Sequence, residues 1–213
     1  MSVSRYLLKI DVSPSGPHST SRTLGGAFTK AFSAASPGTE IRVRDLATTP
    51  LPFLDGEVIA AAFLPEEART PSQKVKHQVR LDLIKELTEA NEIVITTPMW
   101  NWGVPAVLKA YIDQIILIGT LDPYGNRKLA GKKVTVFVSS GFGYGPESEH
   151  HTMDFLSPFL KSVFTVLGSE DVKVISGEFT VAGRKPGFEA LIPAKEKSLV
   201  DGLAAAEARA TSN

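Results

Sequence analysis

The feature that most constrains the fold is a repeated alternation of short apolar runs with longer segments of helical periodicity. The short runs, rich in Val, Ile and Leu, predict five β-strands, over residues 6–12, 40–46, 92–97, 133–139 and 171–176. Apolar residues that recur every three or four positions predict helices over residues 24–35, 72–90, 106–118, 153–167 and 195–210. Parallel neighbouring strands require such crossover helices. The sequence therefore predicts a doubly wound five-stranded parallel sheet with helices on both faces, a three-layer α/β/α domain.

The chain of 213 residues suits one such domain, and we expect residues 1–213 to form a single unit. Residues 40–46 alternate apolar and charged positions, which indicates a strand at the edge of the sheet. Residues 47–71, rich in Pro and Ala, form an excursion in which we expect one short helix, at 57–64.

Composition excludes several classes of partner and site. Lys plus Arg and Asp plus Glu number 23 each, without blocks of like charge, so we expect neither nucleic acid nor a membrane surface as partner. Charged residues interrupt every long apolar run and no signal peptide is evident, so we expect a cytoplasmic protein. Zero cysteines exclude thiolate catalysis and disulfides. His150 and His151 are adjacent, which does not suit metal ligation, so we expect no metal.

The loop after the first strand is rich in hydroxyl groups and ends where a helix begins. Ser13, Ser19, Thr20 and Ser21 lie in this segment. Helix N-termini offer free N–H groups and a partial positive charge, and hydroxyls add further donors, so the loop suits a phosphate group. The alternative is that Ser19 or Ser21 only caps the helix.

The loop after the third strand holds both tryptophans of the chain. Pro98, Met99, Trp100, Asn101 and Trp102 follow one another there. Trp and Met offer flat, polarisable surface to a planar ring, and Asn can donate and accept hydrogen bonds at its edge. The alternative is core packing or a subunit interface.

The loop after the fourth strand alternates glycine with other residues, in the order Ser139, Ser140, Gly141, Phe142, Gly143, Tyr144, Gly145 and Pro146. Glycines let a backbone approach a ligand closely. Position 146 is proline, so this is no dinucleotide G-x-G-x-x-G motif. Because ligands bind beyond the carboxyl ends of parallel strands, we expect these three loops to form one site.

Together the three segments resemble the FMN-dependent NAD(P)H azoreductase and quinone reductase family, which has a flavodoxin-like fold. The resemblance covers nearly the whole chain. It implies that Ser13, Ser19, Thr20 and Ser21 hold the FMN phosphate. The run 99–102 is similar to the family's Met-Tyr-Asn-Phe segment along the flavin ring, and Val104, Pro105, Leu108 and Lys109 extend the match.

Two departures from the family pattern occur in the loop after the fourth strand. The family's Ser-Arg-Gly-Gly corresponds to residues 139–142 here, with Ser140 in place of arginine and Phe142 in place of glycine. The resemblance still implies that Ser139, Ser140, Gly141, Phe142 and Gly143 contact the flavin. Tyr124 resembles a tyrosine that covers the flavin, although Asp122 stands where some members have an aromatic residue.

The resemblance implies a two-electron, ping-pong oxidoreductase that takes hydride from NADH or NADPH and reduces quinones or azo compounds. The flavin carries the redox chemistry, so no catalytic acid–base residue is expected. We expect Tyr124 and Tyr144, with Phe142 and Trp102, to form the pocket for a planar acceptor. The family also implies a homodimer; the apolar helix expected at 104–118 suits either an interface or a core.

Two alternatives remain open at this point. One is a flavodoxin-like FMN electron carrier, although such carriers are usually acidic whereas this chain has no net charge. The other is a domain of the same fold without catalysis, because fold alone does not fix function.

Overall fold

The computed structural model describes residues 5–212, and its centre is one parallel sheet in the strand order β2-β1-β3-β4-β5. The predicted doubly wound α/β fold is confirmed, with β2 at an edge as expected. The strands are β1 (Tyr6–Asp11), β2 (Glu40–Asp45), β3 (Glu92–Pro98), β4 (Lys133–Ser139) and β5 (Asp171–Gly177). The helices are α1 (Thr20–Ala35), α2 (Gly56–Phe63), α3 (Pro71–Glu89), α4 (Ala106–Ile115), α5 (Leu156–Val166) and α6 (Ile192–Thr211).

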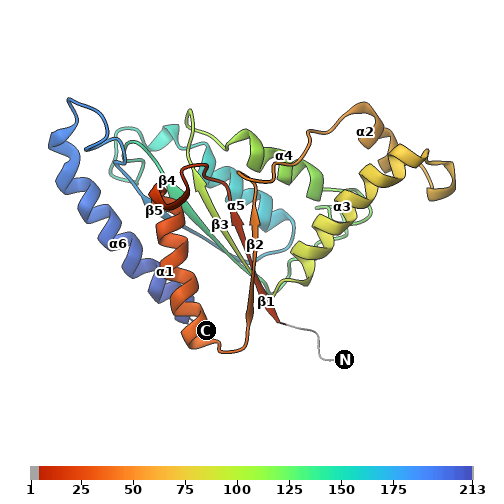
Figure 1. The fold of residues 1–213 in the computed structure, drawn as a ribbon, viewed down its shortest axis with the longest axis horizontal. Helices are drawn as coiled ribbons and strands as arrows, with labels where there is room; N and C mark the ends of the chain where they lie inside the picture. Colours follow the sequence, from red (N-terminus) through yellow and green to blue (C-terminus); the bar gives the residue numbers. More distant parts are fainter. Residues whose placement is uncertain (1–4, 213) are drawn as a thin grey trace.

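Two hydrophobic cores cover the two faces of the sheet. On one face α1 and α6 lie side by side (Figure 1), and Phe28 and Ala206 pack there against Leu7 and Phe137 of the strands. On the other face the core combines inward side chains of the strands with α3, α4 and α5. The central strands are buried on both faces, which explains their continuous apolar runs.

The carboxyl ends of the strands lie at the upper end of the sheet in Figure 1. In register, Ile10 of β1 pairs with Ile95 of β3, and Pro98 of β3 pairs with Ser139 of β4. The order of the strands reverses between β1 and β3, so the loops that follow these two strands diverge there. A crevice at such a switch point is where doubly wound sheets bind ligands.

The helix predicted at 72–90 is confirmed as α3, but the four-residue spacing of Val75, Val79, Leu83 and Leu87, which predicts this helix, does not mark one buried face. Val75 is 68% exposed, and the buried residues are His77, Arg80, Leu83, Ile84 and Leu87. Residues four apart turn by about 400°, so each step of four moves about 40° around the helix. The valines at the start of α3 therefore lie away from the face that Leu87 buries.

Two helices are shorter than predicted, for identifiable reasons. The helix expected to reach residue 118 ends at Ile115, where the buried guanidinium of Arg80 donates to the main-chain oxygens of Asp113, Gln114 and Ile116 and so satisfies carbonyls that a further helical turn would use. The helix expected from residue 153 begins at Leu156, since the carboxylate of Asp154 accepts from the amides of residues 156 and 157.

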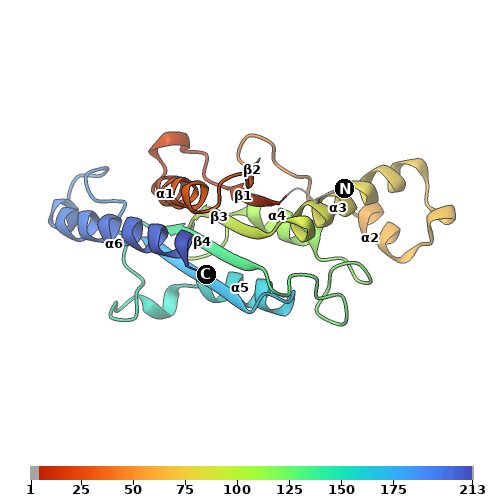
Figure 2. The ribbon, with the colours of Figure 1, turned by 90° about the horizontal axis from the view of Figure 1, so that it is seen from below.

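The excursion after β2 contains the expected short helix, α2, which packs against α3. Both helices project sideways from the sheet, to the right in Figure 1, and Figure 2 shows the same projection from below. Six residues of α4 are buried, and four of them, Leu108, Tyr111, Ile112 and Ile115, belong to the hydrophobic core of this chain. The apolar character of α4 is thus explained by core packing. In residues 5–212 no helix is long and apolar enough to cross a membrane.

Candidate functional site

The hydroxyl-rich loop lies between β1 and α1 and includes a short 3₁₀ turn, Gly16–His18. Ser19 caps α1, because its Oγ accepts from the amide of Arg22 at 3.3 Å, and the same Oγ lies 3.1 Å from Oγ of Ser21. Ser19 therefore caps the helix, and it also lines the cavity described below. Within residues 5–212 no carbonyl accepts from the amides of Thr20 and Ser21, so these two N–H groups stay available to a ligand.

The guanidinium of Arg22 fixes the shape of this loop from behind. Its Nε and Nη2 donate to the main-chain oxygen of Ser13, at 2.9 and 2.7 Å. The same group pairs with Asp45 at 2.8 Å and with Asp11 at 3.1 Å. The hydrogen bonds from Arg22 lower the pKa of Asp45 below its ordinary value. Two carboxylates thus balance the charge of Arg22, which acts on the backbone of the loop.

A polar cavity of about 230 Å³ lies where the three predicted loops meet. It brings together predicted residues from the loops after β1, β3 and β4. The lining residues are Ser13, Ser15, Ser19, Thr20, Pro98, Met99, Trp100, Ser139, Gly141, Thr180 and Arg184. The three loops therefore meet at one cavity, whereas the side chain of Ser21 is buried against Ser19 and does not line it.

The loop after β3 forms a tight turn across its two tryptophans. Trp100 and Gly103 exchange main-chain hydrogen bonds of 3.2 and 3.0 Å, while Asn101 and Trp102 adopt positive φ angles of 48° and 65°. Positive φ suits Asn but is costly for Trp, and such strain tends to collect at functional sites. Trp100 is 47% exposed and Trp102 is 46% exposed, so core packing does not explain them.

The loop after β4 is held by the loop after β5. The carbonyl of Ser140 accepts from the amide and hydroxyl of Thr180, at 3.0 and 2.9 Å, and the amide of Val181 donates to Gly141. Ser140 is buried, and its Oγ donates to the oxygen of Phe142 at 2.7 Å. The hydroxyl that replaces an arginine of the family pattern therefore stabilises its own loop. It does not line the cavity of about 230 Å³.

Gly143 lies under an aromatic ring. A Cβ at this position would be 2.5 Å from Cζ of Phe179, which is closer than side chains approach. Phe179 follows β5 and adopts a positive φ of 59°. The ring can reach the backbone of Gly143 because position 143 has no side chain.

The aromatic residues expected around an acceptor are spread over more than one hollow. Phe142 lines a cavity of about 910 Å³ with Phe179 and Phe188, whereas Tyr144 lines a neighbouring cavity of about 590 Å³. Trp102 lines neither, and Tyr124 is 85% exposed. Within this one chain the structure does not bring the four rings into a single cavity.

Asp122 shapes the turn that presents Tyr124. Its carboxylate accepts from the amides of Gly119 and Tyr124, both at 2.7 Å, and from the side-chain amide of Asn126 at 2.9 Å. The hydrogen bond from Asn126 contributes most to the lowering of the pKa of Asp122. Asp122, which stands where some family members have an aromatic residue, therefore stabilises the turn by three hydrogen bonds.

Three residues that line the cavity were not predicted as site residues from the sequence: Ser15, Thr180 and Arg184. Ser15 lies in the hydroxyl-rich loop, so that loop pattern could have included it. Thr180 and Arg184 follow β5, a strand whose loop carries no recognisable motif. Only the placement of that loop beside the loop after β4 brings them to the cavity.

The donor set of this cavity fits a phosphate group. It offers hydroxyls of serine and threonine, free amides at the start of α1 and one guanidinium, with no carboxylate among the lining residues described. Met99 and Trp100 border the same cavity, so a planar ring attached to that phosphate can extend over apolar surface. These residues fit a flavin mononucleotide.

Comparisons with known proteins agree with this chemistry. A family model described as flavodoxin-like fold matches residues 6–199. A protein of Frankia alni named FMN-dependent NADH:quinone oxidoreductase is 38% identical over 206 residues, which covers 96% of this chain and 98% of that protein. A protein of Burkholderia lata with the same activity in its name is 39% identical over 174 residues and covers 80% of this chain and 82% of its own.

Solved structures show the same fold. An azoreductase from Bacillus anthracis superposes with a TM-score of 0.83 at 20% identity, over 97% of this chain and 99% of that one. An FMN-dependent NADH-azoreductase from the same species, solved in complex with FMN, gives a TM-score of 0.78 at 21% identity over the same shares.

Proposed function

This chain belongs to the FMN-dependent NADH:quinone oxidoreductases of the flavodoxin-like fold, and we propose that it transfers two electrons from NADH to a quinone through FMN held at the junction of its three loops. The observation that carries the proposal is the cavity at the strand-order reversal, whose polar donors adjoin Met99 and Trp100. The relatives' names supply the cofactor, the electron donor and the class of acceptor.

We assign the parts of FMN to the loops as follows. The phosphate is held by the hydroxyls of Ser13, Ser19 and Thr20 and by the free amides of Thr20 and Ser21. Residues 98–102 would hold the flavin ring, and Asn101 would offer donors and acceptors to the ring edge. Residues 139–143 contact the pyrimidine side, mostly through backbone because Ser140 is bonded within its own loop.

FMN bound in this site would supply the hydride and two-electron chemistry between NADH and the acceptor. The residues of this chain bind the cofactor and orient it. Arg22 holds the phosphate loop, the tight turn at 100–103 presents the tryptophans, and Thr180 fixes the loop after β4. We assign no residue as a catalytic acid or base.

Quinones are the proposed acceptors, and we extend the proposal to azo compounds because the solved structures named azoreductases share the fold. Flat aromatic acceptors suit stacking against aromatic rings such as Phe142, which lines the cavity of about 910 Å³, and Tyr144, which lines the neighbouring one. We propose NADH as the donor in preference to NADPH, since the relatives are named for NADH. We also propose that the protein acts in the cytoplasm, where NADH is available.

We further propose a homodimer whose interface includes the projecting α2–α3 region. Apolar side chains gather there without cover from their own chain. The exposed members are Phe53, Ile59, Phe63, Val75 and Ile118. Exposed apolar surface of this kind is typical of subunit contacts. A second subunit also supplies cover for Tyr124 and Trp102, which one chain leaves open.

The relatives' names favour an enzyme over an electron carrier, because they specify a quinone as the substrate. Steady-state assays test this: the FMN-loaded protein should consume NADH only when a small benzoquinone or an azo dye is present. Failure of both acceptors to increase NADH consumption contradicts the proposed activity.

The residue assignments have a separate test in FMN affinity. Asn101→Ala should weaken FMN binding, since it removes the amide at the ring edge. Ser21→Ala should weaken it less, because this hydroxyl acts through Ser19. Ser72→Ala, at an exposed hydroxyl on α3 that bonds Glu57, is the matched control and should bind FMN as the unaltered protein does.

A further inference from the structure

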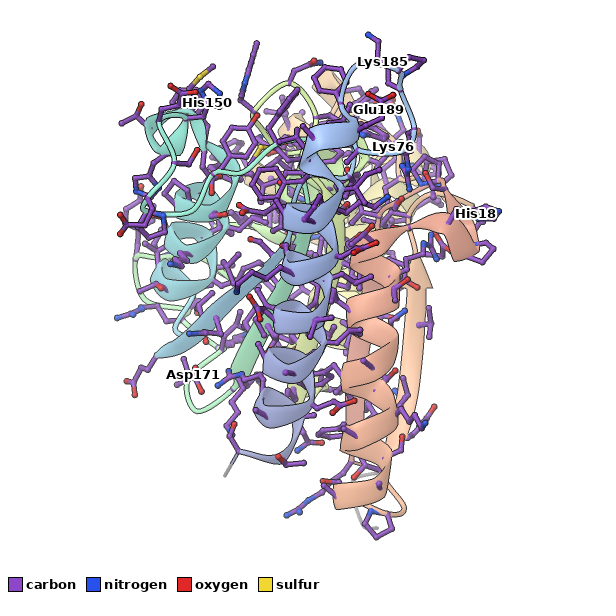
Figure 3. All side chains as sticks on the ribbon, turned by 90° about the vertical axis from the view of Figure 1, so that its left-hand side faces the viewer. His18, Lys76, His150, Asp171, Lys185 and Glu189 are labelled. Atoms are coloured by element: carbon purple, nitrogen blue, oxygen red, sulfur yellow. The ribbon has the colours of Figure 1, made fainter. Side chains whose placement is uncertain are left out.

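The loop after β5, residues 178–188, folds across the end of the sheet and reaches the turn before α1. Its first part is anchored to the loop after β4 through Thr180 and Val181. Its middle is held from α6, where the ammonium of Lys195 donates to the oxygen of Ala182 at 2.8 Å. Figure 3 shows that Lys185 of this loop and His18 lie at the same end of the molecule, where α6 and α1 begin.

Arg184 makes the contact between the loop and the turn. Its Nη2 donates to the main-chain oxygen of His18 at 2.9 Å. Arg184 also lines the cavity of about 230 Å³ together with Ser13, Ser19 and Thr20. A guanidinium has five N–H donors in a planar fork, so one bond to His18 leaves further donors for an anion.

The charge of the cavity depends on this one side chain. Among the lining residues that the structure describes, Arg184 alone carries a charge. Arg22 lies nearby, but Asp11 and Asp45 balance it and its donors serve these carboxylates and Ser13. A phosphate dianion placed among neutral hydroxyls and amides therefore has Arg184 as its nearest available counter-charge.

We infer that Arg184 binds the phosphate of the cofactor, and that through it the loop after β5 makes the site select a phosphorylated flavin over one without phosphate. The inference rests on the proposed function, since it names a further binding residue of the same site. The hydrogen bond to His18 holds the guanidinium beside the start of α1, where the amides of Thr20 and Ser21 have no main-chain acceptor.

The experiment compares the affinities for FMN and riboflavin, which share the ring and differ in the phosphate. Titrations follow the quenching of flavin fluorescence, so the readout does not depend on turnover. A charge-assisted hydrogen bond predicts that Arg184→Gln weakens FMN binding by about tenfold to a hundredfold and changes riboflavin binding by less than about twofold. Arg184→Lys should recover part of the loss, because it restores a point charge without the fork.

Lys185→Gln is the matched control, as it removes the adjacent cation, which does not line the cavity. It should leave both affinities within about twofold, since Lys185 does not line the cavity and makes no contact with a phosphate bound there. Raising the ionic strength should weaken FMN binding more in the unaltered protein than in Arg184→Gln. Thermal unfolding of each variant checks that it is folded.

Equal losses of FMN and riboflavin affinity in a folded Arg184→Gln variant overturn the inference, because the residue then supports the loop without contacting the phosphate. Unchanged FMN affinity in that variant overturns it as well. Absence of FMN binding by the unaltered protein is a different result, which contradicts the proposed function itself.

Discussion

The guanidinium of Arg22 and the carboxylate of Asp45 face each other through two hydrogen bonds of 2.8 and 2.9 Å, and this pair joins α1 to the end of β2. The same guanidinium holds the oxygen of Ser13. One residue therefore links the edge of the sheet to the phosphate loop.

Arg22→Gln should lower the free energy of unfolding by about 1–3 kcal/mol, because Asp45 and the buried Asp11 lose a charged partner. FMN affinity should fall with it, as the carbonyl of Ser13 loses both donors. Urea unfolding and FMN titration measure the two effects. Lys197→Gln breaks an exposed pair with Asp201 on α6 and should cost less than about 0.5 kcal/mol. Equal costs for the two variants argue against the role of Arg22.

Acid should reduce the difference in free energy of unfolding between Arg22→Gln and the unaltered protein. The pKa of Asp45 is lowered in the folded state by its hydrogen bonds to Arg22, so its stabilisation is present above the unfolded pKa of about 3.9 and is lost as pH falls through the folded pKa. Urea unfolding from pH 7 down to pH 3 should show the two stabilities converging below about pH 4. A constant gap across this range contradicts the pairing.

Gly143→Ala should destabilise the protein by about 1–3 kcal/mol, because the new methyl group meets the ring of Phe179. In a Phe179→Gly background the same substitution should cost much less, since the ring is absent. A double-mutant cycle from thermal unfolding gives this coupling. Gly145→Ala, where a Cβ meets nothing within 4 Å, is the control. Additive effects of the Gly143 and Phe179 variants contradict the contact.

Binding of FMN should quench the tryptophan fluorescence strongly, because both tryptophans of the chain lie in the turn at 100–103 and one of them lines the cavity. Trp100→Phe should retain quenching of the remaining tryptophan, Trp102. A titration that leaves the emission unchanged while FMN binds places the flavin elsewhere.

Phe63→Glu should convert a dimer to a monomer in sedimentation velocity, since it places a carboxylate in the apolar α2–α3 surface. Phe63 is 75% exposed within one chain. Val200→Glu is the matched control, because Val200 is 65% exposed on α6 and lies outside that surface. A monomeric unaltered protein contradicts the proposed homodimer, and a Phe63→Glu variant that stays dimeric contradicts the proposed interface.

The strands and most helices could be predicted from the sequence, because periodicity reports which side chains a sheet and its helices bury. The three site loops could be located because they follow predicted strands. Arg184 could not, since the loop after β5 has no motif and only its pairing with the loop after β4 brings it to the cavity. The exposure of Val75 could not be predicted for a related reason. The spacing of apolar residues predicts a helix, but tertiary packing decides which face of that helix is buried.

Absorption spectra in a single anaerobic cuvette test the central claim most directly. Protein loaded with FMN and freed of unbound flavin by gel filtration should show the visible bands of oxidised flavin. Addition of NADH should bleach these bands, and addition of benzoquinone should restore them. Bound flavin that NADH does not bleach, or that benzoquinone does not restore after bleaching, contradicts the account.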